Sequence, residues 1–195
     1  DPVAHPLATP SGRIEIFSDL IDAFGYDDCR GHPAWFEPFE RLGGAGSDRY
    51  PLHLVSHQPA TRLHSQLDHS GYSQRHKVAG REMVRLHPDV AAARGISDGD
   101  TVRLFNDRGA CVAGARLDPD LMPDIVALPT GAWYDPIVPG VPGTLELAGN
   151  PNVLTRDVGT SSLAQGPSAH TCLVEIERCD DVPPGPRVYD PPPFA

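Results

Sequence analysis

The chain has 195 residues, of which 39% are hydrophobic and 22% charged, and its formal net charge at pH 7 is -10. These proportions are typical of a folded globular domain and exclude a wholly disordered chain, and the negative charge argues against nucleic acid as a partner. The 19 glycines and 22 prolines favour many short strands and turns over long helices, and no run of about 18 apolar residues predicts a membrane-spanning helix.

Residues 1–48 are predicted to form a leading segment. Within it, a Pro-Ser-Gly turn comes before the alternating run Arg13–Phe17, which predicts a strand. The segment ends in a glycine-rich stretch, RLGGAGSD, which is typical of a joint between domains. We therefore expect a domain boundary near Asp48.

From Tyr50 onward the pattern changes to a succession of short strands, with one short helix predicted at Asp89–Arg94. Six or more short strands with one or two short helices predict a mainly β domain that closes into a barrel. The proline-rich residues 181–195 predict an extended tail packed on a surface. The predicted strands are residues 51–57, Met83–Leu86, Ile125–Leu128, Cys172–Ile176 and a hairpin over Thr101–Leu117 that turns at Asn106–Gly109.

Cysteine and histidine give little support for a metal site. The four cysteines, Cys29, Cys111, Cys172 and Cys179, form no CxxC pair and are interpreted as free thiols, two of them in apolar strands. Four histidines, His57, His64, His69 and His76, lie within twenty residues of one another, but Pro59 and Gly71 interrupt any regular helix that could present them together. We expect them to be solvated or hydrogen-bonded.

Common catalytic and nucleotide motifs are missing from the sequence. It has no G-x-S-x-G nucleophile elbow, no G-x-x-x-x-G-K-[ST] phosphate loop and no G-x-G-x-x-G after a strand. Hydrolysis is therefore disfavoured, and any nucleotide would be bound by another arrangement.

Two polar clusters outside the strands remain, residues 61–66 and 149–166. They are rich in Asn, Gln, Ser, Thr and His, whose side chains offer hydrogen-bond donors and acceptors side by side. Such groups suit a flat, nitrogen-rich heterocycle, and the glycines would let the backbone approach it closely. The alternative is that these are long loops whose polar side chains satisfy their own backbones.

Several collinear stretches resemble the C-terminal domain of the dimethyl sulfoxide reductase family of molybdenum enzymes. They are RLHSQLD, GREMVRLHPDVAAARGISDGDTVRLFNDRG, GAWYDP and GNPNVLTRDVGTSSLAQG, with HPLATPSGRIEIFSD similar to the segment that leads into that domain and RVYDPPPFA similar to the C-terminus. Within the family, the chain is similar to the branch of biotin sulfoxide, trimethylamine N-oxide and dimethyl sulfoxide reductases. The resemblance implies a six-stranded double-psi β-barrel with an N-terminal extension, and it divides the chain into residues 1–48, 49–180 and 181–195.

The resemblance also implies a cofactor and a reaction. The cofactor is bis(molybdopterin guanine dinucleotide) molybdenum, shared with upstream domains of the same polypeptide, and the barrel would cover its pterins. The reaction is oxygen-atom transfer from a small S-oxide or N-oxide, in the manner of biotin sulfoxide reductase. The serine that typically ligates the metal comes from an earlier domain, so no catalytic residue is assigned here and the chain alone is expected to be inactive.

By motif match, the cofactor-binding residues would be His57, His64, Ser65, Gln66, Asn152, Gln165 and His170. If so, Gln66 and Asn152 should face a common hollow. The alternative is a free-standing barrel that acts as a non-catalytic binding or interaction module. We expect the parent protein to be cytoplasmic, or periplasmic if a twin-arginine signal precedes these residues.

Overall fold

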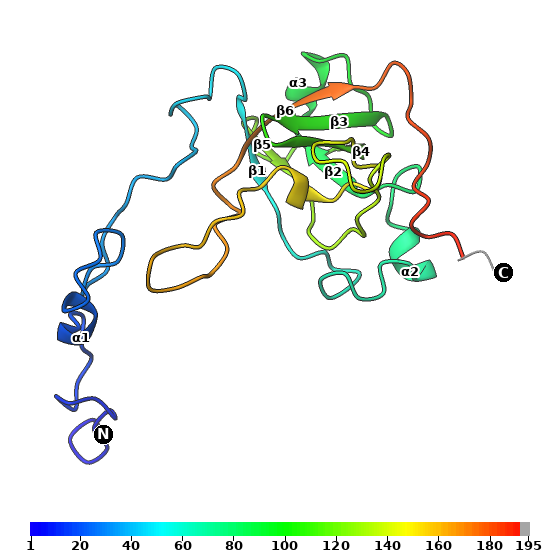
Figure 1. Ribbon diagram of the computed structural model, residues 1–195. Helices are drawn as coiled ribbons and strands as arrows, with labels where there is room; N and C mark the ends of the chain where they lie inside the picture. Colours follow the sequence, from blue (N-terminus) through cyan, green and yellow to red (C-terminus); the bar gives the residue numbers. More distant parts are fainter. Residues whose placement is uncertain (192–195) are drawn as a thin grey trace. The chain divides into compact units, whose positions relative to one another are not determined.

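The computed structural model describes residues 1–191 and contains one closed six-stranded barrel (Figure 1). Neighbouring strands follow the order β1-β5-β2-β4-β3-β6, and β6 pairs back onto β1. The mainly β, six-stranded double-psi barrel predicted from the sequence is confirmed. The strands are β1 Leu52–Val55, β2 Met83–Leu86, β3 Thr101–Asn106, β4 Gly109–Leu117, β5 Ile125–Ala127 and β6 Leu173–Arg178.

Two of the strand pairs are parallel, and they determine where the loops emerge. β1 pairs with β5 and β2 pairs with β4 in parallel, while the other pairs are antiparallel. The carboxyl ends of parallel neighbours lie at the same edge of a sheet. The loops that follow β1 and β5 therefore leave the barrel side by side.

The core fills the inside of the barrel with alternating aliphatic side chains. Leu54, Leu104 and Val84 are fully buried, and the residues beside them on the same strands face outward. Cys111 and Cys172 are free thiols inside this core, as expected, and burial raises the pKa of Cys172 to about 11. A raised pKa keeps the thiol protonated, and the Cys172 thiol donates to the Leu154 carbonyl at 3.3 Å.

The helices are single turns that begin at clear capping residues. The predicted helix at Asp89–Arg94 is present as α3, and it starts one residue earlier because Pro88 follows the N-cap residue His87. The helical segments are α1 Asp19–Asp22, α2 Gly71–Gln74, α3 Pro88–Ala92 and the 3-10 turn η1 Pro151–Val153. None of these helical segments is long enough to form a layer of its own, so the barrel provides the hydrophobic core.

The chain divides into two compact units. One contains Phe39–Arg156 together with the chain from Ala169 onward, and so holds the barrel; the other combines Asp1–Pro38 with Asp157–Ser168. In the second unit the predicted strand at Arg13–Phe17 is wrong. Its alternating residues Ile14 and Ile16 are 81% and 73% exposed, and no neighbouring strand among residues 1–191 pairs with them. An alternating pattern without a partner strand cannot form a sheet.

Across residues 1–191, none of the helices has the length and apolar character that crossing a membrane requires.

Replacement of Leu104 by Ala tests the barrel core. Leu104 is fully buried on β3, and the cavity left by the change should lower the free energy of unfolding by about 2–5 kcal/mol. Urea unfolding followed by circular dichroism measures the loss. The control is Met122→Ala, where the side chain is 60% exposed and the change should stay within about 0.5 kcal/mol. Equal losses in the two variants would contradict the assigned core.

Candidate functional site

The site is built where β1 and β5 end. The Leu128 amide donates to the Val55 carbonyl at 3.0 Å, and the Thr130 amide donates to the His57 carbonyl at 2.9 Å. These bonds extend the contact between the two segments two residues past the end of β1 and three residues past the end of β5. They hold the loop after β1, residues 57–68 (the β1 loop), against the loop after β5, residues 128–135 (the β5 loop).

Between these loops and the turn that contains η1 lies a pocket of about 430 Å³, called the polar pocket below. Three segments that are distant in sequence line it, so only the folded barrel brings them together. The lining residues are His64 and Ser65 from the β1 loop, Thr130, Gly131, Ala132, Trp133 and Tyr134 from the β5 loop, and Asn150 and Asn152 from the η1 turn.

Gly131 makes the close approach of the two loops possible. Its φ is +90°, and a Cβ atom placed on it would lie 2.0 Å from the His64 carbonyl oxygen. No side chain fits there, because the strain of the positive φ adds to a direct clash with backbone. Across the same junction, the Trp133 indole Nε1 donates to the Ser65 carbonyl at 2.7 Å.

Asn150 attaches the η1 turn to the β5 loop. Its side-chain amide donates to the Ala132 carbonyl at 2.8 Å, and its side-chain oxygen accepts from the Asn152 amide at 2.9 Å. The second bond is the N-cap of η1. One buried asparagine therefore sets the position of Asn152 relative to the rest of the pocket.

Glu146 anchors the base of the same turn. Its carboxylate is fully buried and accepts hydrogen bonds from the backbone amides of Ala148, Gly149, Asn150 and, on the β5 loop, Asp135. Burial raises the pKa of Glu146, and the four amides offset this only in part. The carboxylate of Glu146 is therefore the hydrogen-bond acceptor for four backbone amides, which in a regular strand would bond to carbonyl groups.

A buried cluster of four charged side chains, two cations and two anions, is bonded to the backbone of the pocket loops. Asp68 pairs with Lys77 at 2.9 Å and with Arg62 at 3.3 Å, and Glu82 pairs with Arg62 at 2.6 Å and with Lys77 at 3.2 Å. The exposed fraction of each side chain is 6% or less. Because the charges balance, the cluster avoids the large cost of an unpaired buried ion.

This charge cluster also holds the two loops. Arg62 donates from Nε to the His64 carbonyl at 3.1 Å and from a terminal nitrogen to the Thr130 carbonyl at 2.9 Å. The guanidinium can bond two loops at once because its donors are arranged in a rigid plane. Arg62 therefore braces the walls of the pocket.

Asp68 receives further hydrogen bonds from the pocket side. Its Oδ2 accepts from the Trp133 amide at 3.0 Å and from the Tyr189 hydroxyl at 2.7 Å. Burial alone would raise the pKa of Asp68, but the hydrogen bond and charge of Lys77, with the bonds from Tyr189 and Trp133, outweigh it and lower the pKa. The carboxylate is therefore ionised throughout the neutral range.

The structure brings three of the predicted site residues into one pocket: His64, Ser65 and Asn152. His57 joins them through its backbone bond to Thr130, and its imidazole has a pKa lowered by burial and by the charge of Arg85. The assignment of these residues to a cofactor stays a prediction.

The other three predicted residues do not line the polar pocket. Gln66 follows Ser65 directly and is exposed, and His170 is exposed shortly before β6. Gln165 belongs to the other compact unit, where its side-chain amide donates to the Ser161 carbonyl at 3.2 Å. In this bond a polar side chain pairs with the backbone of its own loop, which is the alternative to cofactor binding given above for the polar loops.

Sequence reasoning missed several residues of the pocket. Asn150 and the Gly131–Tyr134 segment lie in stretches that carried the family resemblance, GNPNVLT and GAWYDP, but no site role was assigned to them. Gln58 was also missed: its side chain bonds the His64 ring at 2.8 Å and the His64 amide at 3.1 Å. An amide six residues before a histidine gives no pattern that identifies such a contact.

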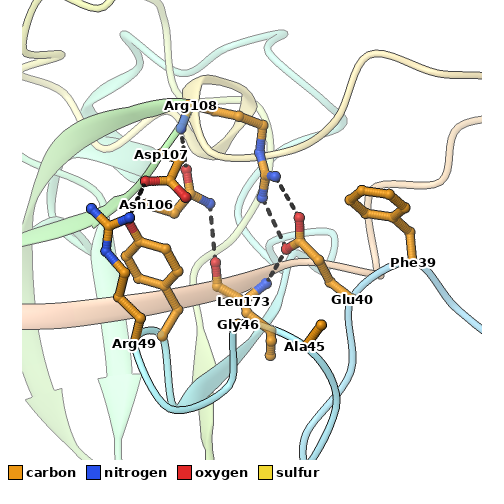
Figure 2. Close-up of a pocket in the computed structure, with 10 residues that line it drawn as sticks. Phe39, Glu40, Ala45, Gly46, Arg49, Asn106, Asp107, Arg108 and Leu173 are labelled. Atoms are coloured by element: carbon orange, nitrogen blue, oxygen red, sulfur yellow. Dashed lines mark hydrogen bonds and ion pairs between the residues drawn. The ribbon is translucent and has the colours of Figure 1, made fainter.

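A second, more apolar pocket of about 490 Å³ lies in the same unit (Figure 2). Figure 2 shows Arg108 directed at Glu40, which also accepts from the Leu173 amide at 2.7 Å. Arg49 pairs with Asp107 at 2.7 Å. The charged groups of this pocket are thus paired with one another, which leaves little for a polar ligand to bind.

No group of three or more metal-ligating side chains occurs within residues 1–191.

A family model and a solved structure both match this chain. The family described as molydopterin dinucleotide binding domain matches residues 52–173, and the chain belongs to that family. A solved structure, acetylene hydratase from Pelobacter acetylenicus, has the same fold with a TM-score of 0.70 at 20% identity, over 90% of this chain and 24% of that one.

Several close relatives indicate which enzymes within this family the chain resembles. The chain is 50% identical over 98% of its length to dimethyl sulfoxide/trimethylamine N-oxide reductase of Cereibacter sphaeroides, and 52% identical over 97% to biotin sulfoxide reductase of the same organism. It is 56% identical over 91% to trimethylamine-N-oxide reductase 1 of Escherichia coli K12. It spans 23%, 25% and 21% of these relatives. The chain is homologous to the C-terminal domain of the dimethyl sulfoxide reductase family, as the sequence motifs indicated.

Replacement of Asp68 by Asn tests the charge cluster. At pH 7 the change leaves two buried cations with one anion and should lower the free energy of unfolding by about 3–5 kcal/mol. A lowered pKa stabilises the fold above the ordinary aspartate pKa of about 3.9, and this contribution disappears as the pH falls through the folded-state value. The difference between the variant and the parent chain should therefore shrink below about pH 4.

Urea unfolding at several pH values measures this difference. The control is Asp120→Asn, an exposed carboxylate between β4 and β5, where the change should stay within about 0.5 kcal/mol. A penalty for Asp68→Asn that is the same at pH 3 and pH 7 would show that charge pairing is not what the carboxylate contributes.

Proposed function

We propose that this chain is the cofactor-covering domain of a molybdenum oxidoreductase that reduces S-oxides or N-oxides by oxygen-atom transfer. The observation that carries the proposal is the polar pocket, in which three loops of a molydopterin dinucleotide binding domain present amide, hydroxyl and imidazole groups. The names of the relatives, which are reductases of dimethyl sulfoxide, trimethylamine N-oxide and biotin sulfoxide, support the substrate class.

The donor set of the pocket fits a pterin. Among residues 1–191, the Asn152 side-chain amide and the Ser65 hydroxyl make no hydrogen bond within the protein, although both line the pocket. An unused amide can pair with the donor and acceptor edge of a flat heterocycle. Both side chains are exposed, so their hydrogen-bonding groups are available to a ligand, which supports the pterin interpretation over self-satisfied loops for these two residues.

The other residues of the pocket would hold the cofactor in one orientation. His64 is kept in place by its two bonds to Gln58, and its φ of +50° turns the backbone sharply at the pocket. The Trp133 ring is fixed by its bond to the Ser65 carbonyl. Preformed groups of this kind bind a ligand with little loss of conformational entropy.

When bound, the molybdenum cofactor supplies the two-electron, oxygen-transfer chemistry that protein side chains lack. This chain binds and orients the pterin part and shields it from water. We assign it no catalytic residue, since the ligand to the metal and most of the dinucleotide site belong to upstream domains of the same polypeptide. The 195-residue chain is therefore proposed to be inactive alone and active as part of its parent.

The substrate we favour is a small sulfoxide such as biotin sulfoxide, with amine N-oxides as close alternatives. The chain carries a formal net charge of -10 at pH 7, which is unfavourable for nucleic acid. Substrate choice would depend on the upstream domains that complete the funnel to the metal.

The double variant Ser65→Ala, Asn152→Ala, made in the full-length polypeptide, tests the proposal. Each lost hydrogen bond to the pterin should cost about 1–3 kcal/mol, so molybdenum and pterin contents per protein should fall together with sulfoxide and N-oxide reduction. Molybdenum is measured by mass spectrometry, pterin by fluorescence after acid release, and turnover with a reduced dye as electron donor.

The matched control is Ser97→Ala, an exposed serine after α3 that does not line the polar pocket. It should keep full cofactor content and activity. The single variant Gln66→Ala tests whether the predicted contact beyond the pocket exists. If the double variant retained its molybdenum, pterin and activity, the cofactor site would have to lie elsewhere, and a non-catalytic binding module would become the better interpretation.

A further inference from the structure

The C-terminal tail is attached to the rest of the barrel unit by two buried side chains, Arg81 and Asp135, and by Tyr189 of the tail itself. Arg81, which is 2% exposed, donates to the carbonyls of Pro183 and Pro184 at 2.7 Å. Asp135, which is 6% exposed, accepts from the backbone and the side chain of Arg187. The tail therefore has a defined path as far as residue 189, and residues 192–195 lie outside the described part of the chain.

The third attachment is Tyr189, and it reaches the buried charge cluster. Its hydroxyl donates to Asp68 Oδ2 at 2.7 Å, its ring lies 6.0 Å from the Trp133 ring, and the Lys77 ammonium sits 5.2 Å from its centre. Burial and then the hydrogen bond to Asp68 raise the pKa of Tyr189 above its ordinary range, so the hydroxyl keeps its proton and remains a donor.

The same carboxylate oxygen of Asp68 also accepts from the Trp133 amide, while Oδ1 faces Arg62. Arg62 holds the β1 loop at His64 and the β5 loop at Thr130. Both loops that line the polar pocket thus depend on the position of one carboxylate. Tyr189 is the tail residue that donates a hydrogen bond to this carboxylate.

We propose that Tyr189 is a positioning residue, which ties the C-terminal tail to Asp68 and so holds the β1 loop and the β5 loop together at the polar pocket. Tyr189 does not line the pocket, so it acts through Asp68, Trp133 and Arg62. The consequence for cofactor binding rests on the function proposed above, whereas the holding of the loops does not.

The test is Tyr189→Phe in the full-length polypeptide, which removes the hydroxyl and keeps the ring against Trp133 and Lys77. Hydrogen exchange of the cofactor-free protein, measured by mass spectrometry, should become about tenfold faster in peptides from both loops, since a hydrogen bond to a charged acceptor is lost. Peptides from β3 and β4 should be unchanged, which separates local loosening from a general loss of stability.

The matched control is Tyr72→Phe on α2, where the ring is 54% exposed and contacts His76 and Arg75. It should leave exchange in both loops at the parent rate. Unchanged loop exchange in Tyr189→Phe, or equal acceleration throughout the barrel, would overturn the proposal.

Cofactor content of the same variant separates this inference from the proposed function. Faster loop exchange together with a lower pterin and molybdenum content after dialysis would support both. Faster loop exchange with full retention of the cofactor would still support the positioning role of Tyr189, but it would count against the polar pocket as the pterin site.

Discussion

The buried pairing of Arg62, Lys77, Asp68 and Glu82 is the interaction on which the candidate site depends. Four charges are removed from water on a barrel of modest size, and only their mutual neutralisation makes this affordable. In return, Arg62 and Asp68 each bind backbone groups of the pocket loops. A loop held in this way can keep a side chain such as Ser65 ready for a ligand instead of bonding it internally.

The pocket is formed both by the strand pairing of the barrel and by side-chain hydrogen bonds in the loops. Parallel pairing of β1 and β5 sends two loops out at one edge, and Glu146 and Asn150 add the third from the η1 turn. Together these interactions place residues more than 80 positions apart in sequence around one hollow (compare His64 with Asn152), which is how a β-barrel turns polar connections into a binding surface.

Much of the fold was predictable because it is encoded locally. Strand β2 falls at the predicted residues, and the β3–β4 hairpin turns where Asn106–Gly109 indicated. The strand expected at Arg13–Phe17 failed because alternation does not supply a partner strand. Of the residues that line the polar pocket, His64, Ser65 and Asn152 were predicted as cofactor contacts from their polar character and the family resemblance. Asp68 and Tyr189 were not, because a contact across 121 residues leaves no periodic signal in the chain.

The central claim is that the polar pocket on this barrel receives the pterin of a molybdenum cofactor. The most direct measurement is a crystal structure of the full-length polypeptide with its cofactor bound. It should show a pterin edge within hydrogen-bonding distance of the Asn152 amide and the Ser65 hydroxyl, with both loops placed as they are here. A pocket filled by side chains of a neighbouring domain, with the pterin bound elsewhere, would contradict the account.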